Sequence, residues 1–398
     1  MMGKLFSTFK AVFILGTLVV ILSRIAGFLG HTAFGAGTRT PPSVILISVD
    51  TLRPDHLSCY GYRRASTPHI DAIAREGTIF TQVSSQVPLT LPSHVSMLTS
   101  TYPFANGVQD NAVRLGPEAV TLATVLKSRG YHTAAFVGGF VLDRRFGLNR
   151  GFDEYDSPFD LHRQQGKDPG DIKRLGEDVT NSAEKWVTEN SGSPFFVFLH
   201  LYDLHTPYEF PKGKRPLGGA SGYDAELRYV DDVLGHFWDF LQQRQLLSKM
   251  LVVFVSDHGE SLGEHGESTH GYFIYQSTLH VPLIFHWPAQ TAAFPPQIEE
   301  PASLLDVAPT ILQYLRLQEP AQFQGRSLLG SLHGHTTSAN EEIYSESLYA
   351  HRHFGASSLR GLQVGAYKYI EAPKPELYDL ERTRGKVPIY TTPSTRWP

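Results

Sequence analysis

Five largely apolar runs recur along the chain, and polar or turn-forming residues bound each of them. They occupy residues 44–50, 132–139, 194–203, 250–257 and 281–288. Runs of this length, rich in Val, Ile, Leu and Phe, are typical of strands buried on both faces of a parallel sheet. Between them lie segments with apolar residues at helical spacing, at 67–77, 118–130, 175–190, 225–246 and 306–317. Strands that alternate with helices predict an α/β domain with a mainly parallel sheet covered on both faces.

The pattern changes near residue 340. Short strand-like pieces follow at 342–348, 359–372 and 376–381, which predict a small antiparallel subdomain. The stretch "TRTPPS" at 38–43 is a turn-rich linker that precedes the first apolar run. These boundaries divide the chain into an N-terminal segment (1–37), an α/β domain (43–335) and a C-terminal subdomain with its tail (340–398).

The N-terminal segment predicts export. Lys4 and Lys10 precede a short apolar run, Ala11–Leu22. Basic residues ahead of such a run are typical of a secretory signal. The run is shorter than the ~20 residues that span a bilayer, although residues 25–29 would extend it. We therefore expect a periplasmic or extracellular protein, and both a cleaved signal and a single membrane anchor stay open.

Composition narrows the function classes. A net charge of −4 gives no basis for nucleic-acid binding, which usually needs a strongly basic face. The single cysteine, Cys59, excludes an intramolecular disulfide and a zinc site built on cysteines. Histidine is the commonest metal ligand in proteins, and the chain contains 18 of them, several close to aspartates. A metal site without thiolate ligands is therefore the first chemistry to look for.

Acidic and imidazole side chains follow the ends of three of the apolar runs. These residues are Asp50, Asp203, His205, Asp257, His258 and Glu260, with His265 and His270 a few positions later. In open α/β sheets ligands bind beyond the carboxyl ends of the strands, so we expect these side chains at one edge. Oxygen and nitrogen ligands suit zinc, manganese, magnesium or calcium. A lone strand-end aspartate is more often a cap or turn former, but Asp257 and His258 end their run abruptly.

The same residues lie within longer motifs that carry a family resemblance. The motifs are "SVDTLRPDHLSCYGYRRASTPHIDAIAREGTIF", "PLTLPSHVSMLTSTYP", "SDHGESLGEHG" and "ELYDLE". Together they resemble the sulfatase family of the alkaline-phosphatase-like superfamily over residues 43–380. The resemblance implies a three-layer α/β/α core with a small C-terminal antiparallel subdomain. It also implies a divalent metal beside the nucleophile.

Individual site residues follow from the resemblance position by position. Asp50, Asp257 and His258 resemble the metal ligands, and Thr90 resembles the nucleophile, which also contacts the metal. The segment "DLHTPY" resembles a loop of phosphoethanolamine transferases that places His205 opposite the nucleophile. "SDHGESLGEHGESTHG" resembles their motif in which the last histidine, here His270, serves the site. "YPFANGVQDN" resembles a phosphodiesterase segment in which Asn111 contacts a phosphoryl oxygen.

The chain departs from the sulfatase pattern at the nucleophile. Sulfatases oxidise a cysteine or serine in a C/S-x-P-S-R motif to formylglycine, and this chain has "TLPSH" instead. Threonine cannot yield an aldehyde, so no formylglycine is expected. His94 replaces the arginine of the motif and is predicted to bind substrate, and Thr51 stands where sulfatases have a second aspartate. The Lys-x-His pair of the family is missing, since "FVGGFVL" occupies its place.

These departures favour phosphorus chemistry. A plain threonine alkoxide is the nucleophile of phosphate-transferring relatives, namely nucleotide pyrophosphatase/phosphodiesterases and the phosphoethanolamine and phosphoglycerol transferases. We expect a metal-dependent hydrolase of sulfate or phosphate esters, with a covalent intermediate on Thr90 and a phosphoester preference. The substrate would be a small-molecule, glycan or lipid-headgroup ester. The alternatives are an envelope transferase of the phosphoethanolamine or phosphoglycerol type and a non-catalytic binding module.

Neighbouring residues have plainer interpretations. His205 and His270 either hold a second metal or contact the oxyanion and protonate the leaving group. Ser93 is expected to cap the first helical turn, and Arg53 to form a structural ion pair. His265 is expected to orient a metal ligand, and Cys59 to be a small buried apolar residue.

Overall fold

The computed structural model describes residues 40–160, 166, 168–208, 222–289, 291, 293–335, 342–383 and 390–391. The predicted signal or anchor segment, residues 1–37, lies outside this part of the chain, as does most of the C-terminal tail. No helix within the described part is long and apolar enough to cross a membrane. The choice between a cleaved signal and a membrane anchor stays a prediction.

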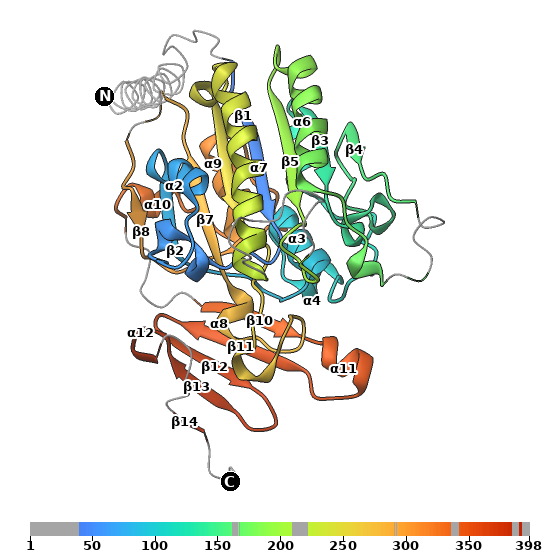
Figure 1. The fold of residues 1–398 in the computed structure, drawn as a ribbon, viewed down its shortest axis with the longest axis vertical. Helices are drawn as coiled ribbons and strands as arrows, with labels where there is room; N and C mark the ends of the chain where they lie inside the picture. Colours follow the sequence, from blue (N-terminus) through green and yellow to red (C-terminus); the bar gives the residue numbers. More distant parts are fainter. Residues whose placement is uncertain are drawn as a thin grey trace, which may run out of the picture. The chain divides into compact units, whose positions relative to one another are not determined.

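The core is a nine-stranded sheet with the order β4-β3-β5-β1-β6-β7-β2-β8, and β9 pairs with β2 (Figure 1). The strands are β1 (Ser43–Val49), β2 (Thr78–Ser84), β3 (His132–Val137), β4 (Glu154–Asp156), β5 (Phe195–Leu201), β6 (Met250–Val255), β7 (His280–His286), β8 (Gln297–Ile298) and β9 (Ala302–Ser303). The strands β4, β3, β5, β1 and β6 run parallel to one another, whereas β7 is antiparallel to both β6 and β2. The mainly parallel sheet is confirmed.

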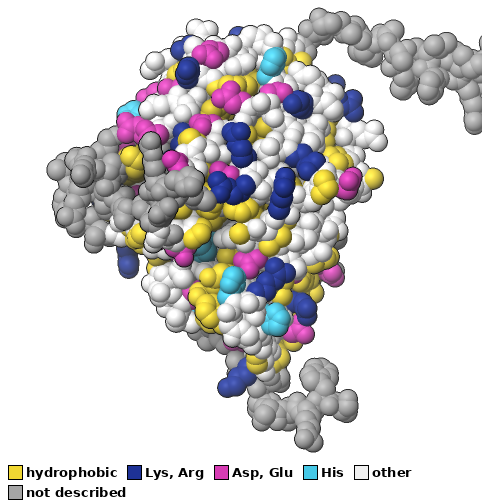
Figure 2. Space-filling model, turned by 90° about the vertical axis from the view of Figure 1, so that its right-hand side faces the viewer, with side chains coloured by type: hydrophobic (Ala, Val, Ile, Leu, Met, Phe, Trp, Pro, Cys, Tyr) yellow, Lys and Arg dark blue, Asp and Glu magenta, His cyan; other side chains and the backbone are white. Residues whose placement is uncertain are grey.

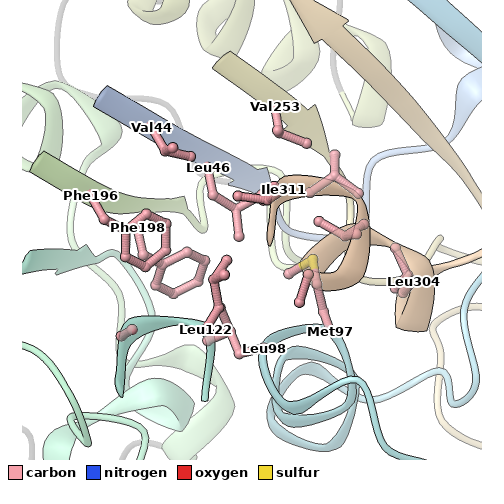
Figure 3. Packing of buried hydrophobic residues seen from close by; sticks show 14 of the residues in the cluster. Val44, Leu46, Met97, Leu98, Leu122, Phe196, Phe198, Val253, Leu304 and Ile311 are labelled. Atoms are coloured by element: carbon pink, nitrogen blue, oxygen red, sulfur yellow. The ribbon is translucent and has the colours of Figure 1, made fainter. Parts of the chain in front are cut away.

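Alternation along the central strands divides the core in two. Val44 and Leu46 of β1 pack with Phe196 and Phe198 of β5 in one cluster (Figure 3). That cluster also contains apolar residues of α3 (Thr90–Thr99), α5 (Leu122–Ser128) and α9 (Val307–Tyr314). The intervening residues of the same strands meet α2 (Pro68–Arg75), α6 (Gly176–Asn190) and α7 (Tyr223–Gln243) in a second cluster. Helices on both faces of one sheet confirm the three-layer α/β/α prediction.

A second, five-stranded antiparallel sheet follows, with the order β10-β11-β12-β13-β14. Its strands are β10 (Glu342–Ser347), β11 (Leu359–Val364), β12 (Tyr367–Glu371), β13 (Glu376–Asp379) and β14 (Tyr390–Thr391). Helix α11 (Tyr349–Phe354) connects β10 to β11, and the inner face packs on α8 (Gln276–Leu279). The remaining short helices are α4 (Pro103–Asn106), α10 (Leu329–Leu332) and α12 (Leu380–Thr383). The predicted antiparallel subdomain is confirmed, while the exact division at 335–340 stays a prediction.

The surface carries charges of both signs. On the face shown in Figure 2, Lys and Arg side chains are interspersed with Asp and Glu and with apolar side chains. This mixture agrees with the small net charge of −4. It offers no continuous basic surface on this face for a nucleic acid.

Lys368 of β12 is a buried charge without a carboxylate partner among the described residues. Its side chain is 3% exposed, and Nζ donates one hydrogen bond, of 3.3 Å, to Gln276 Oε1. Burial lowers its pKa from 10.5 to about 7. The unfolded chain therefore binds more protons between these pH values, and stability should rise with pH across that window.

Lys368→Met should stabilise the fold at pH 7 by about 1–4 kcal/mol, because the methionine needs no counter-charge in the apolar interior. It should also remove the rise in stability between pH 7 and 10.5. Chemical denaturation over this pH range would measure both effects. Lys374→Met, at an exposed position of the same sheet, is the matched control and should change neither. A clear destabilisation by Lys368→Met would show that the ammonium is compensated.

Candidate active site

The predicted metal ligands meet at the carboxyl edge of the sheet. Ser48 of β1 pairs with Val255 of β6, so Asp50 and Asp257, two residues further on, emerge side by side. Both carboxylates continue the rows of side chains that face α3. His258 follows directly, and ligand atoms of the three residues all lie within 4.8 Å of one another. These three residues come together because β1 and β6 are adjacent parallel strands that end at the same edge of the sheet.

Thr90 is the first residue of α3 and lies against this cluster. It is 1% exposed, and its Oγ1 is 3.3 Å from His258 Nε2. Leu91 N–H is bonded to Asn111 Oδ1 at 3.0 Å, and Pro92 has no N–H. A helix start usually presents a row of free N–H groups to an anion. Here the N–H groups of Leu91 and Pro92 are bonded or absent, so the favourable term that remains is the helix dipole.

Two of the three predicted ligands present carboxylate oxygens that no protein donor uses, and the third presents an imidazole nitrogen beside the Thr90 hydroxyl. Asp50 Oδ1 and Asp257 Oδ2 are buried and have no hydrogen-bond partner among the described residues. Burial raises the pKa of both carboxyl groups to about 7. His258 Nδ1 donates to the Gly259 carbonyl at 2.9 Å, which leaves a lone pair on Nε2. Two orphaned carboxylate oxygens and one imidazole nitrogen fit a divalent cation.

Thr51 occupies the position where sulfatases have a second aspartate. Its backbone adopts a left-handed conformation with φ 55°. Its N–H donates to Asp257 Oδ1 at 3.3 Å, and its hydroxyl donates to the Leu204 carbonyl at 3.1 Å. Thr51 therefore orients one carboxylate and ties the segment after β5 to the segment after β1.

His94 does not face a substrate, contrary to its predicted role. It is 0% exposed, and Nδ1 donates to the Thr90 carbonyl at 2.8 Å. Its Nε2 accepts from the Ser48 hydroxyl at 2.8 Å, and Asp257 Oδ2 lies 3.5 Å from Nδ1. His94 thus links α3 to β1 of the sheet.

His200 of β5 is a site neighbour that the sequence interpretation missed. Its Nε2 donates to Asp50 Oδ2 at 3.2 Å, and the ring is fully buried. Burial lowers its pKa to about 4, so the ring is neutral. The signal was one polar residue inside an otherwise apolar strand, on the same face as Asp50.

His270 and Glu260 form a buried pair beside the metal-ligand cluster. Glu260 is 0% exposed, and its Oε1 lies 3.0 Å from His270 Nδ1. Burial disfavours the imidazolium, but the Glu260 carboxylate outweighs it and raises the pKa of His270 to about 9. The His270 ring centroid is 4.5 Å from that of His258.

His205 lies next to His270, with ring centroids 5.0 Å apart. Its Nδ1 donates to the Thr206 carbonyl, so Nε2 keeps the lone pair. Burial lowers its pKa well below the usual value. The ring stacks on Tyr202 with centroids 4.4 Å apart. The two histidines therefore differ in character, since His270 is charged and His205 is neutral.

Two expectations about neighbouring residues met different outcomes. Arg53 forms the predicted structural ion pairs, with Asp55 at 2.8 Å and Glu264 at 2.9 Å. Ser93 does not cap its helix, because its hydroxyl donates to the Asp257 carbonyl at 2.6 Å. It fixes the strand end instead of the helix start.

Other candidates lie away from the cluster. Asp203 caps α6, since its Oδ1 accepts the Gly176 N–H at 2.9 Å. The His265 ring stacks on Tyr275 at 3.6 Å, so its predicted role in orienting a ligand gains no support. Cys59 is only half-buried against the second core cluster. A cavity of about 360 Å³ between the core and the second sheet contains none of the metal-ligand residues.

Comparison with known proteins places this geometry in a family. The Sulfatase family model matches residues 42–317, and the model for the C-terminal part of N-sulphoglucosamine sulphohydrolase matches residues 263–393. The ulvan-active sulfatase of Formosa agariphila is 25% identical over 336 residues, which cover 73% of this chain and 64% of that relative.

Solved structures share the fold. A protein solved with its substrate D-glucosamine-2-N,6-O-disulfate has a TM-score of 0.72 at 21% identity, over 87% of this chain and 92% of its own. The phosphonate monoester hydrolase of Agrobacterium radiobacter has a TM-score of 0.70 at 20% identity, over 87% and 90%. Because the Sulfatase family model matches residues 42–317, more than half of the chain, the chain belongs to the sulfatase family of ester hydrolases.

Proposed function

We propose that this protein is a metal-dependent ester hydrolase that acts through a covalent intermediate on Thr90 and prefers phosphorus esters to sulfate esters. The observation that carries the proposal is the Thr90 hydroxyl, 3.3 Å from His258 Nε2 and next to two carboxylates with orphaned oxygens. A threonine in this place can attack phosphorus, but it cannot be converted to the formylglycine aldehyde that sulfatases use.

Asp50, Asp257, His258 and the Thr90 hydroxyl would hold the metal ion, which we expect to be zinc, manganese, calcium or magnesium. Their two carboxylates would balance its double positive charge. When bound, the ion supplies Lewis acidity that lowers the pKa of a coordinated hydroxyl. No further protein base is then needed to activate Thr90.

The chain's own residues account for a two-step displacement. Thr90 Oγ1 attacks phosphorus in line, the bond to the leaving-group oxygen breaks, and a phosphoryl or phosphonyl ester forms on Thr90. Asn111 assists by its side-chain amide: its Oδ1 is fixed by Leu91 N–H, so Nδ2 is the group that would donate to a non-bridging oxygen. Water then cleaves the ester on Thr90 and restores the hydroxyl.

The two neighbouring histidines divide the proton transfers. Glu260 engages His270 Nδ1, so His270 Nε2–H is the donor for the leaving-group oxygen. The Thr206 carbonyl engages His205 Nδ1–H, so His205 Nε2 is the acceptor for a proton of the attacking water. We prefer these roles to a second metal on His205 and His270.

We infer an anionic ester on a small molecule, a glycan or a lipid headgroup as the substrate. The relatives named above act on ulvan and on a sulfated glucosamine, and the shared fold also serves a phosphonate monoester hydrolase. Export to the periplasm or the cell exterior rests on the basic and apolar pattern of residues 1–37.

A panel of esters tests the proposal. The full-length chain would be stripped with a chelator and reloaded separately with zinc, manganese, magnesium or calcium. We expect turnover of 4-nitrophenyl phosphate, bis(4-nitrophenyl) phosphate or a phenylphosphonate monoester, and at least about a hundredfold slower turnover of 4-nitrophenyl sulfate. Thr90→Ala is the blank.

The remaining outcomes of the panel decide against specific parts of the proposal. Sulfate turnover at a comparable rate would show that threonine suffices for sulfate esters and that the preference is wrong. No turnover of any ester with any metal would instead favour the transferase or the binding module.

A further inference from the structure

We propose that Lys173 is a positioning residue for His205 and thereby controls the hydrolysis of the covalent intermediate; this inference rests on the proposed function. Lys173 Nζ donates to the backbone carbonyls of Asp203, His205 and Pro207, at 3.5, 3.4 and 2.9 Å. An ammonium group has three donors and no acceptor. All three are therefore used on the single loop that carries His205.

The loop needs such a cation because of its shape. Three carbonyl oxygens of alternate residues converge on one point, where their partial negative charges would repel one another. A charge-assisted hydrogen bond to each oxygen turns that repulsion into attraction. The carboxylate of Asp203, at the start of the loop, is already bound to α6 through Gly176 N–H. The loop is thus fixed at its start by Asp203 and along its length by Lys173.

The segment that carries Lys173 also fixes the side chain that stacks on the His205 ring. That ring stacks on Tyr202, whose hydroxyl donates to the Gly170 carbonyl at 3.0 Å. Residues 172–174 pair with residues 138–140 through Phe140 N–H to the Ile172 carbonyl and Arg174 N–H to the Gly138 carbonyl. This backbone pairing fixes the position of Lys173 relative to the loop that carries His205.

Gly139 completes the arrangement by leaving room for Tyr202. A Cβ atom at Gly139 would come within 2.7 Å of the Tyr202 ring, and one at Gly138 within 2.9 Å of the His200 carbonyl. The two glycines stand where the family resemblance implies a Lys-x-His pair. Here their space is given to the aromatic ring that supports His205.

Lys173 touches no reacting atom in this scheme, because its three donors are committed to carbonyls. Its effect must pass through the place of His205 Nε2, the acceptor for the attacking water. Loss of Lys173 should therefore slow the second step and leave the first step, attack by Thr90, largely unchanged. A general loss of folding would slow both steps.

Pre-steady-state kinetics separate these cases. The holoenzyme and its Lys173→Met and Lys173→Arg variants would be mixed with the 4-nitrophenyl ester that the wild type turns over fastest. In Lys173→Met we expect kcat to fall by tenfold or more, but by less than the ~10²–10⁴ that loss of the general base itself would cost. We expect kcat/KM to stay within about threefold, because it reports the steps up to the first bond cleavage. A burst of one nitrophenolate per enzyme should appear.

Matched variants sharpen the comparison. Lys173→Arg keeps cationic N–H donors and should recover most of kcat. His205→Ala should show the same burst, and the double variant should be no slower than His205→Ala alone, since both changes act on one group. Lys127→Met removes a surface ion pair to Asp153 and should change nothing. Equal falls in kcat and kcat/KM without a burst, or additive effects in the double variant, would overturn the proposal.

Amide hydrogen exchange provides a readout that needs no turnover. Peptides that cover residues 202–208 should exchange faster in Lys173→Met, whereas those that cover β6 should not change. This result would support the role of Lys173 in fixing the loop even if the wild type hydrolysed none of the esters. In that case only the proposed function would fail. Unchanged exchange at 202–208 would show that Lys173 does not hold the loop.

Discussion

Thr90→Ala should abolish ester turnover, with a fall in kcat on the order of 10⁴–10⁶, the loss seen when a covalent nucleophile is removed. Ser93, one turn further along α3, is not placed to replace it, because its hydroxyl donates to the Asp257 carbonyl at 2.6 Å. The fold should survive, since the contact of the Thr90 hydroxyl with His258 Nε2 is long, at 3.3 Å. Initial rates, together with thermal unfolding, would measure both effects.

Thr90→Ser is the matched control for this substitution. It keeps the hydroxyl and loses only a methyl group, so we expect it to retain activity within about a hundredfold of the wild type. Acid quench during turnover followed by peptide mass analysis should find the phosphoryl or phosphonyl group on the peptide that contains residue 90 in both active forms. Substantial activity in Thr90→Ala, or a label on another peptide, would place the nucleophile elsewhere.

Asp257→Asn should abolish activity by at least about 10³-fold and yet stabilise the metal-free protein. The carboxylate is 0% exposed, and its Oδ2 has no hydrogen-bond partner among the described residues. Without a metal it lies close to the second buried carboxylate, Asp50, and an uncompensated buried charge is costly. An amide of the same shape removes that charge, so the free energy of unfolding should rise by about 1–3 kcal/mol.

Thermal unfolding with chelator and with each added metal would test this exchange of stability for function. The melting temperature of the wild type should rise on metal addition, because the ion binds the folded state preferentially. That of Asp257→Asn should respond weakly or not at all. Asp306→Asn is the control: Asp306 is 5% exposed but accepts N–H groups of Ser303 and Arg326, so its replacement should destabilise with and without metal. A wild-type protein indifferent to every metal would contradict the assigned ligand set.

The position of the candidate site could be predicted from the sequence because its polar residues directly follow long apolar runs. Asp50 and Asp257 each come directly after a buried strand, and both strands proved to be neighbours in the sheet. Thr90 lies at the start of a helix that covers the same face. Periodicity alone cannot tell which strands are adjacent, so the family resemblance was needed to join the three residues into one site.

The supporting residues could not be predicted, because their roles depend on contacts across the fold. His94 was expected to bind substrate. It lies one helical turn after Thr90, and its ring bonds to Ser48 and to the Thr90 carbonyl instead. Lys173 belongs to a segment without any local pattern, and its partners lie about 30 residues further along the chain. The antiparallel direction of β7 was also hidden, since a strand buried on both faces has the same apolar composition in either direction.

The side-by-side exit of Asp50 and Asp257 from neighbouring strands limits how the chain length can change. Deleting or inserting one residue within β1 or β6 would turn its aspartate to the opposite face of the sheet, because side chains alternate along a strand. Such changes would break the metal-ligand cluster at once. Surface loops that carry no site residue are far more tolerant, because doubling the length of a loop costs only about 0.6 kcal/mol. Length differences between this chain and a relative of which it covers 64% are therefore expected outside β1 and β6.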